Sequence, residues 1–77
     1  VLVYVNGSFF PRGQASVSVF DSGFVLGDGV WEGLRLVKGR LISLEAHLDR
    51  LFEGARSIDL DIGLDRAGVT KVVTDTL

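Results

Sequence analysis

A glycine-rich stretch full of apolar side chains, FDSGFVLGDGVWEGLRLVKGR at residues 20–40, restricts the folds open to this chain more than any other feature. Five glycines alternate with phenylalanine, valine and leucine residues and with the only tryptophan, Trp31. A flexible linker would be polar, and a regular core element would avoid so many glycines. The stretch therefore predicts tight turns that bring apolar side chains close to another surface.

The size of the chain sets a limit on its independent stability. It has 77 residues, 47% of them hydrophobic, which is room for one small domain and too apolar for a disordered tail. No cysteine can cross-link it, so we expect a compact partner or the rest of a longer protein. We interpret residues 1–77 as the incomplete N-terminal part of a larger protein, because the last residues still follow a helical pattern. A complete small protein is the alternative.

Charge and hydropathy exclude several classes of partner. The formal net charge is −2, from 8 basic and 10 acidic residues without a basic cluster, so nucleic acid and anionic membranes are poor partners. No apolar run approaches the ~18 residues of a membrane-spanning helix. The absence of cysteine favours a cytoplasmic protein and excludes a disulfide scaffold.

The N-terminal residues predict β-structure. In VLVYVNGSFFP, a β-branched and aromatic run meets Asn6-Gly7, and Pro11 closes the returning run. This pattern is typical of a hairpin with a two-residue turn. ASVSVF at 15–20 alternates serine with valine and predicts a third strand with one wet face.

The second half predicts another hairpin and two helices. Lys38-Gly39 is expected to join two short strands, and Ser43 to cap a helix over 44–58 with its hydroxyl. Asp65 is expected to start a second helix. Strands followed by helices predict an α+β fold, in which helices cover one face of a small, largely antiparallel sheet.

The predicted helix 44–58 has two distinct faces. Its apolar stripe contains Leu48 and Ala55, while His47, Arg50 and Gly54 share the other side at spacings of three and four. These polar residues are consistent with an ordinary solvated surface. Alternatively, a gap at Gly54 lets another group approach, beside an arginine fork that suits a phosphate.

Common catalytic and nucleotide-binding motifs are absent. GDGVWEG is one residue too long for the dinucleotide fingerprint, and no P-loop occurs. His47 is the only histidine, so neither a histidine metal site nor a Ser/His/Asp set can be assembled. Asp21 and Asp28 are better explained as turn and cap residues than as a glycosidase pair.

Taken in order, these motifs carry a family resemblance over nearly all of residues 3–60. They are the Asn6-Gly7 turn, Asp21-x-Gly23, Gly27-Asp28-Gly29-Val30-Trp31-Glu32-Gly33, the Lys38-Gly39 turn and His47-Leu48-Asp49-Arg50-Leu51. The chain resembles the N-terminal domain of class IV (fold type IV) pyridoxal-phosphate enzymes. That family includes branched-chain and D-amino acid aminotransferases, (R)-selective amine transaminases and aminodeoxychorismate lyase.

The resemblance implies a role for particular residues. Arg50 would bind the phosphate of pyridoxal 5'-phosphate in a cleft against a larger C-terminal domain. Trp31 and Leu26 would line the substrate pocket, although ordinary core packing is the alternative for Trp31. The stretch 24–29 would lie near the partner subunit of a homodimer. The substrates would be a small amino donor and a 2-oxo acid acceptor.

Some positions depart from the family pattern and leave alternatives open. Asp21-Ser22-Gly23 often has histidine or arginine in the middle, and Leu26 stands where an aromatic residue is usual. Neither Lys38 nor Lys71 matches the family's catalytic lysine, so we assign no catalytic residue and no metal ligand here. A lyase acting on aminodeoxychorismate and a non-catalytic dimerisation module are the alternatives to an aminotransferase.

Overall fold

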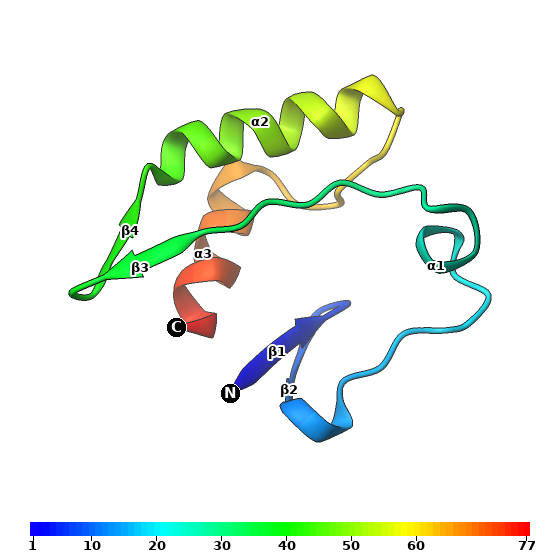
Figure 1. Cartoon of the computed structure of the whole chain (residues 1–77), viewed down its shortest axis with the longest axis horizontal. Helices are drawn as coiled ribbons and strands as arrows, with labels where there is room; N and C mark the ends of the chain where they lie inside the picture. Colours follow the sequence, from blue (N-terminus) through cyan, green and yellow to red (C-terminus); the bar gives the residue numbers. More distant parts are fainter. The chain divides into compact units, whose positions relative to one another are not determined.

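The computed structural model describes residues 1–77, which fall into two units: Val1–Leu26 with Leu64–Leu77, and Gly27–Gly63. Figure 1 shows the elements of both in chain order. The strands are all antiparallel and are accompanied by helices, so the predicted α+β class is confirmed. They form two separate two-stranded sheets, however, and not one sheet.

The first unit begins with the predicted hairpin. Strand β1 (Leu2–Val5) pairs with β2 (Ser8–Pro11), and Tyr4 stands opposite Phe9. Their rings meet edge to face with centroids 5.2 Å apart, a favourable aromatic arrangement. Asn6 and Gly7 have φ of 48° and 92°, the left-handed conformations that this tight turn requires.

The predicted strand at 15–20 is wrong. After a short 3₁₀ turn η1 (Arg12–Gln14), the backbone runs without a strand partner. The Ser18 hydroxyl accepts a hydrogen bond from the Phe20 N–H at 3.0 Å, and the Ser18 carbonyl accepts one from the Asp21 N–H. Serine thus makes the local turn that competes with strand pairing. The unpredicted helix α1 (Ser22–Leu26) follows directly.

Helix α3 (Arg66–Thr76) completes this unit and packs against β1. As predicted, Asp65 starts it, and the Asp65 carboxylate accepts a hydrogen bond from the Gly68 N–H at 2.7 Å. Val69 of α3 is the unit's buried residue. Local sequence signals therefore predict both the hairpin at the beginning of this unit and the helix at its end.

The second unit contains the other predicted hairpin and the longest helix. Strand β3 (Arg35–Val37) pairs with β4 (Arg40–Ile42) across Lys38 and Gly39, whose φ values are 50° and 76°. Helix α2 (Leu44–Ser57) buries Leu48 and Ala55, as its apolar stripe predicted. With Val69, these two are the three buried residues of the chain.

Two details at the ends of α2 differ from expectation. Ser43 does occupy the position before the helix, but its hydroxyl makes no capping hydrogen bond. Its φ of 55° is left-handed, whereas a capping serine normally has extended backbone. At the other end the helix stops at Ser57, and Ile58 is left exposed.

No helix combines the length and the apolar character that crossing a membrane requires. No group of three or more histidine, cysteine, aspartate or glutamate side chains is arranged to hold a metal ion.

Candidate functional site

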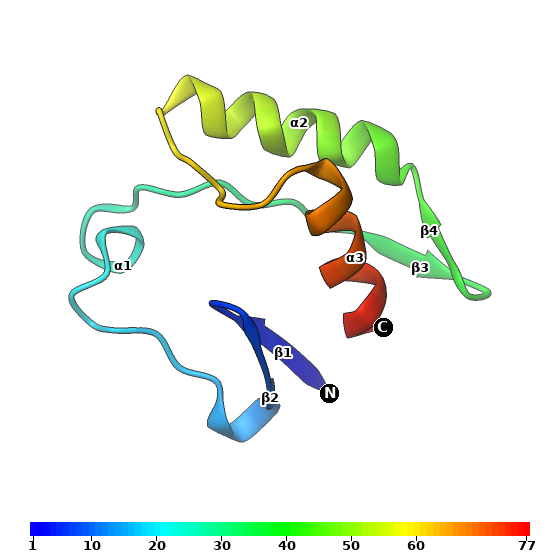
Figure 2. The same ribbon diagram turned by 180° about the vertical axis from the view of Figure 1, so that it is seen from behind.

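The candidate site lies in the second unit, where an extended segment of residues 30–34 runs alongside α2 (Figures 1 and 2). Exposure alternates along this segment: Val30, Glu32 and Leu34 are partly buried, while Trp31 and Gly33 are exposed. In extended backbone, successive side chains point to opposite sides. The even-numbered residues of segment 30–34 therefore form its inner side, and we see two of them in contact with α2.

Val30 lies against the glycine of the helix. A Cβ atom built at Gly54 would be 3.3 Å from Val30 Cγ1, so the absence of a side chain at Gly54 is what allows this close approach. The sequence predicted a gap at Gly54 that would let another group approach the helix. In the structure, the side chain of Val30 from the same chain occupies this gap.

The two contacts of the segment are spaced to match the helix. Val30 meets Gly54, and two residues later Glu32 meets Arg50. Two residues of extended chain span roughly 6.6 Å, and four residues of helix rise roughly 6 Å. The segment can therefore run antiparallel to α2 and use every second side chain without strain.

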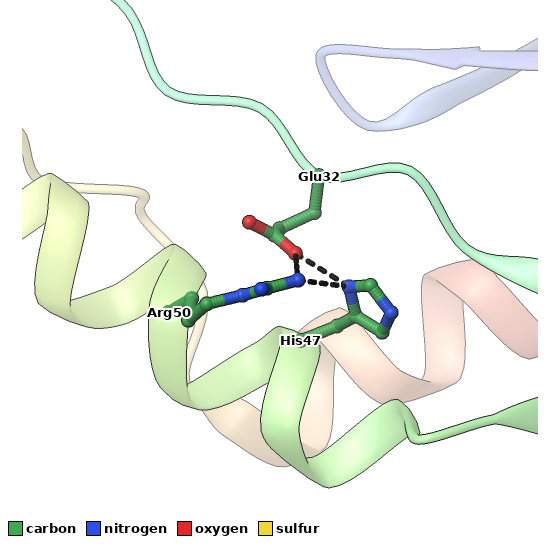
Figure 3. Close-up of polar contacts among 3 residues, drawn as sticks. All are labelled: Glu32, His47 and Arg50. Atoms are coloured by element: carbon green, nitrogen blue, oxygen red, sulfur yellow. Dashed lines mark hydrogen bonds and ion pairs between the residues drawn. The ribbon is translucent and has the colours of Figure 1, made fainter.

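Glu32 joins two helix residues through one oxygen atom (Figure 3). Its Oε1 is 2.8 Å from Arg50 Nη2 and 2.5 Å from His47 Nδ1. Arg50 Nη2 is also 3.0 Å from His47 Nδ1. An imidazole nitrogen cannot donate and accept at once, and an unprotonated Nδ1 would face the carboxylate with a lone pair. We therefore assign the proton to Nδ1, so that both N–H groups converge on Oε1.

The electrostatics of this cluster favour an ionised carboxylate. The hydrogen bond from His47, followed by that from Arg50, lowers the pKa of Glu32 below its ordinary value of 4.5. The Glu32 and His47 side chains are each 20% exposed, but the Arg50 side chain is 65% exposed. Glu32 and His47 thus form the enclosed part of the cluster, and the guanidinium forms its open part.

Arg50 retains the capacity to bind an anion. Its bond to Glu32 uses one N–H of Nη2, and the planar guanidinium has further N–H groups on Nη2, Nη1 and Nε, of which an adjacent pair can form a fork. Such a fork matches two oxygens of a phosphate or carboxylate. The exposed donor set therefore fits a phosphate group. We interpret it as a binding feature, because the Glu32 carboxylate and His47 Nδ1 are already hydrogen-bonded to each other.

Trp31 points away from the Glu32 cluster, on the outer side of the extended segment. Its side chain is highly exposed (84%), so it is not part of this chain's core. The edge of its ring lies near the neighbouring glycine: a Cβ built at Gly33 would be in ordinary contact with Trp31 Cζ3, at 3.9 Å.

Leu26, the other predicted pocket residue, ends α1 in the first unit and is also exposed. The structure brings together Arg50, His47 and Glu32, of which sequence analysis had proposed a functional role for Arg50 alone. Glu32 was missed. The available signal was its position between Val30 and Leu34, an acid on the apolar side of an alternating pattern.

Comparisons with known proteins support the resemblance, although no family model matches the chain. A protein of Methanocaldococcus jannaschii named "Putative branched-chain-amino-acid aminotransferase" is 44% identical over 97% of this chain. Branched-chain-amino-acid aminotransferase-like protein 1 of Arabidopsis thaliana is 46% identical over the whole chain, and D-alanine aminotransferase of Staphylococcus haemolyticus is 36% identical over 97% of it.

The matched regions are short parts of these relatives. The chain spans 26% of the Methanocaldococcus protein, 14% of the Arabidopsis protein and 27% of the Staphylococcus protein.

Proposed function

We propose that this chain is the N-terminal part of a class IV, pyridoxal-phosphate-dependent aminotransferase, because it is 36–46% identical to proteins with aminotransferase or aminotransferase-like names over 97–100% of its own length. The complete enzyme would move an amino group between a small amino donor and a 2-oxo acid. The observation that carries this proposal is the exposed guanidinium of Arg50, hydrogen-bonded to Glu32 within a segment that matches proteins named as aminotransferases over 97% of its length.

Arg50 is the residue that would hold the cofactor. When bound, pyridoxal phosphate stabilises the negative charge that develops on the α-carbon of an amino acid. The contribution of this chain is to bind the phosphate through the free N–H groups of Arg50. His47 already directs its Nδ1–H to Glu32, which leaves the guanidinium as the cationic group of the cluster that faces outward.

Trp31 and Leu26 are proposed as walls of the substrate pocket. Both are large, apolar and exposed in this chain, as substrate-facing side chains must be before the rest of a pocket closes over them. Trp31 would form a broad wall, because its large indole ring is 84% exposed. A leucine at position 26 offers no hydrogen bond, so recognition of a substrate carboxylate must come from elsewhere.

The same reasoning extends to the neighbouring residues of α1. Phe24 and Val25, like Leu26, are exposed large hydrophobic side chains. We propose that the partner subunit of a homodimer covers the stretch 24–29. The absence of cysteine fits a cytoplasmic enzyme.

This segment does not supply the catalytic lysine. Lys38 occupies a hairpin turn, and Lys71 pairs with Asp75 at 2.7 Å on the surface of α3. The lysine that carries the cofactor would come from another part of the enzyme. Two of the relatives reported above are named as aminotransferases and the third as an aminotransferase-like protein, so we prefer a transferase to a lyase or a dimerisation module. Turnover that depends on a 2-oxo acid would distinguish it from release of pyruvate by a lyase.

The proposal is tested by Arg50→Ala in the full-length enzyme. A charge-assisted hydrogen bond contributes about 1.5–3 kcal/mol, so the dissociation constant for pyridoxal phosphate should rise roughly 10- to 150-fold. It is measured by titrating the apoenzyme and following cofactor absorbance. Arg56→Ala, which removes an exposed arginine near the end of the same helix, is the control and should leave the constant unchanged. An unchanged constant in Arg50→Ala, with the fold intact by circular dichroism, would refute the phosphate role.

A further inference from the structure

We propose that Glu32 is a positioning residue that acts through Arg50: by accepting a hydrogen bond from Nη2, it fixes the guanidinium so that its remaining N–H groups face the cofactor phosphate. The inference deepens the proposed function and rests on Arg50 being the phosphate ligand. It assigns to Glu32 no contact with the phosphate.

The need for a positioning residue follows from the exposure of Arg50. Its side chain is 65% exposed, and a long exposed side chain samples many rotamers. An anion that binds a mobile guanidinium must first order it, which weakens binding. A hydrogen bond at one corner of the fork removes most of this freedom, while the opposite corner stays available.

Glu32 is itself fixed well enough to perform this task. Its side chain is only 20% exposed, and the same Oε1 atom accepts a second hydrogen bond from His47 (Figure 3). The neighbouring contact between Val30 and Gly54 fixes the backbone of segment 30–34 against α2. Two contacts besides Arg50 thus restrain Glu32: the hydrogen bond from His47 to its carboxylate and the contact between Val30 and Gly54.

Orientation, and not attraction, is the expected contribution of Glu32. A carboxylate beside a phosphate site repels a bound anion. Its presence next to the proposed phosphate ligand is therefore useful only if the geometric gain exceeds that repulsion. Glu32→Gln separates the two effects, because the amide oxygen can accept from Nη2 and Nδ1 while the negative charge is gone.

A purely structural role for Glu32, as a link between segment 30–34 and α2, predicts a different pattern. Loss of the link would weaken cofactor binding whether or not Arg50 is present. A positioning role acts only through Arg50, so removing Glu32 should have no further effect once Arg50 is gone. A double-mutant cycle on the cofactor dissociation constant makes this distinction.

The experiment measures binding of pyridoxal phosphate to the apo form of the full-length enzyme. Glu32→Ala should raise the dissociation constant about tenfold, whereas Glu32→Gln should stay within about threefold of the unmodified enzyme. Glu32→Ala combined with Arg50→Ala should equal Arg50→Ala alone. Glu53→Ala, which removes an exposed carboxylate of the same helix, is the matched control and should have no effect.

The outcomes separate the two claims. If Glu32→Ala leaves the constant unchanged, or raises it by the same factor in both backgrounds, the positioning role is wrong. If Arg50→Ala has no effect either, the phosphate role of Arg50 fails as well. Should Glu32→Ala not fold, Glu32→Asp decides: it keeps the charge but is one methylene shorter, so a raised constant supports positioning and an unchanged constant overturns it.

Discussion

Segments 15–20 and 30–34 both alternate in side-chain character, but only the second packs against another element of the structure. Val17 and Val19 of the first segment are 64% and 63% exposed, and no strand pairs with it. The second segment is extended and places Val30 and Glu32 in contact with α2. Alternation alone therefore does not specify burial. What distinguishes segment 30–34 is a matching surface, with a glycine opposite its valine and two N–H donors opposite its acid.

The largest expected effect comes from comparing a buried side chain of α2, against which segment 30–34 packs, with an exposed side chain of segment 15–20. Leu48→Ala removes a residue that is 2% exposed on α2 and should lower the free energy of unfolding by about 2–5 kcal/mol. Val17→Ala should change it by less than about 0.5 kcal/mol, because its side chain already meets solvent in this chain. Chemical denaturation of the full-length enzyme, with hydrogen exchange of the α2 amides, measures both.

Equal losses from the two variants would contradict the contrast. They would mean that segment 15–20 is buried against another part of the full-length enzyme as completely as α2 is within this chain.

The sequence predicted those parts of the fold that depend on a few neighbouring residues. Asn6-Gly7 and Lys38-Gly39 adopt left-handed turns, and Asp65 caps α3 with its own side chain. Each of these is a local preference of the backbone or of a short polar side chain. Their positions could be read without knowing the tertiary structure.

The failures involve competing local contacts or distant partners. Ser18 was expected in a strand, but its side chain and carbonyl form a turn instead. Ser43 has the right residue type for a cap, but its left-handed backbone prevents the bond. Glu32 meets Arg50 across a sequence separation of 18 residues, so helical spacing within α2 could identify Arg50 but not its partner.

A second test removes the matching surface itself. Gly54→Val places a branched side chain where even a Cβ would be 3.3 Å from Val30 Cγ1, so segment 30–34 must shift. Overpacking of this kind should destabilise the enzyme by roughly 1–3 kcal/mol. The shift should also weaken cofactor binding, because Glu32 would move with Val30. Denaturation and apoenzyme titration report the two effects.

Gly13→Val is the control for that substitution. A Cβ at Gly13 meets no atom within 4 Å, so the added side chain has open space and should cost much less than the same change at Gly54. If both substitutions are equally costly, the close approach of Val30 to α2 is not what limits position 54.

The smallest expected effect is a pH dependence that belongs to segment 30–34. Hydrogen bonds from His47 and Arg50 lower the pKa of Glu32 below 4.5, so the unfolded chain takes up the proton first as pH falls. The stabilisation by Glu32 is therefore complete above about pH 4.5 and is lost as pH falls through its lower pKa in the folded protein. Thermal unfolding of the unmodified enzyme and of Glu32→Gln between pH 7 and pH 4 measures this loss of stabilisation. The melting temperature of the unmodified enzyme should exceed that of Glu32→Gln by a constant amount near neutral pH, and the difference should shrink towards the acidic end. A difference that instead grows on acidification would mean that the folded protein favours the protonated acid, which is incompatible with a carboxylate shared by two N–H donors.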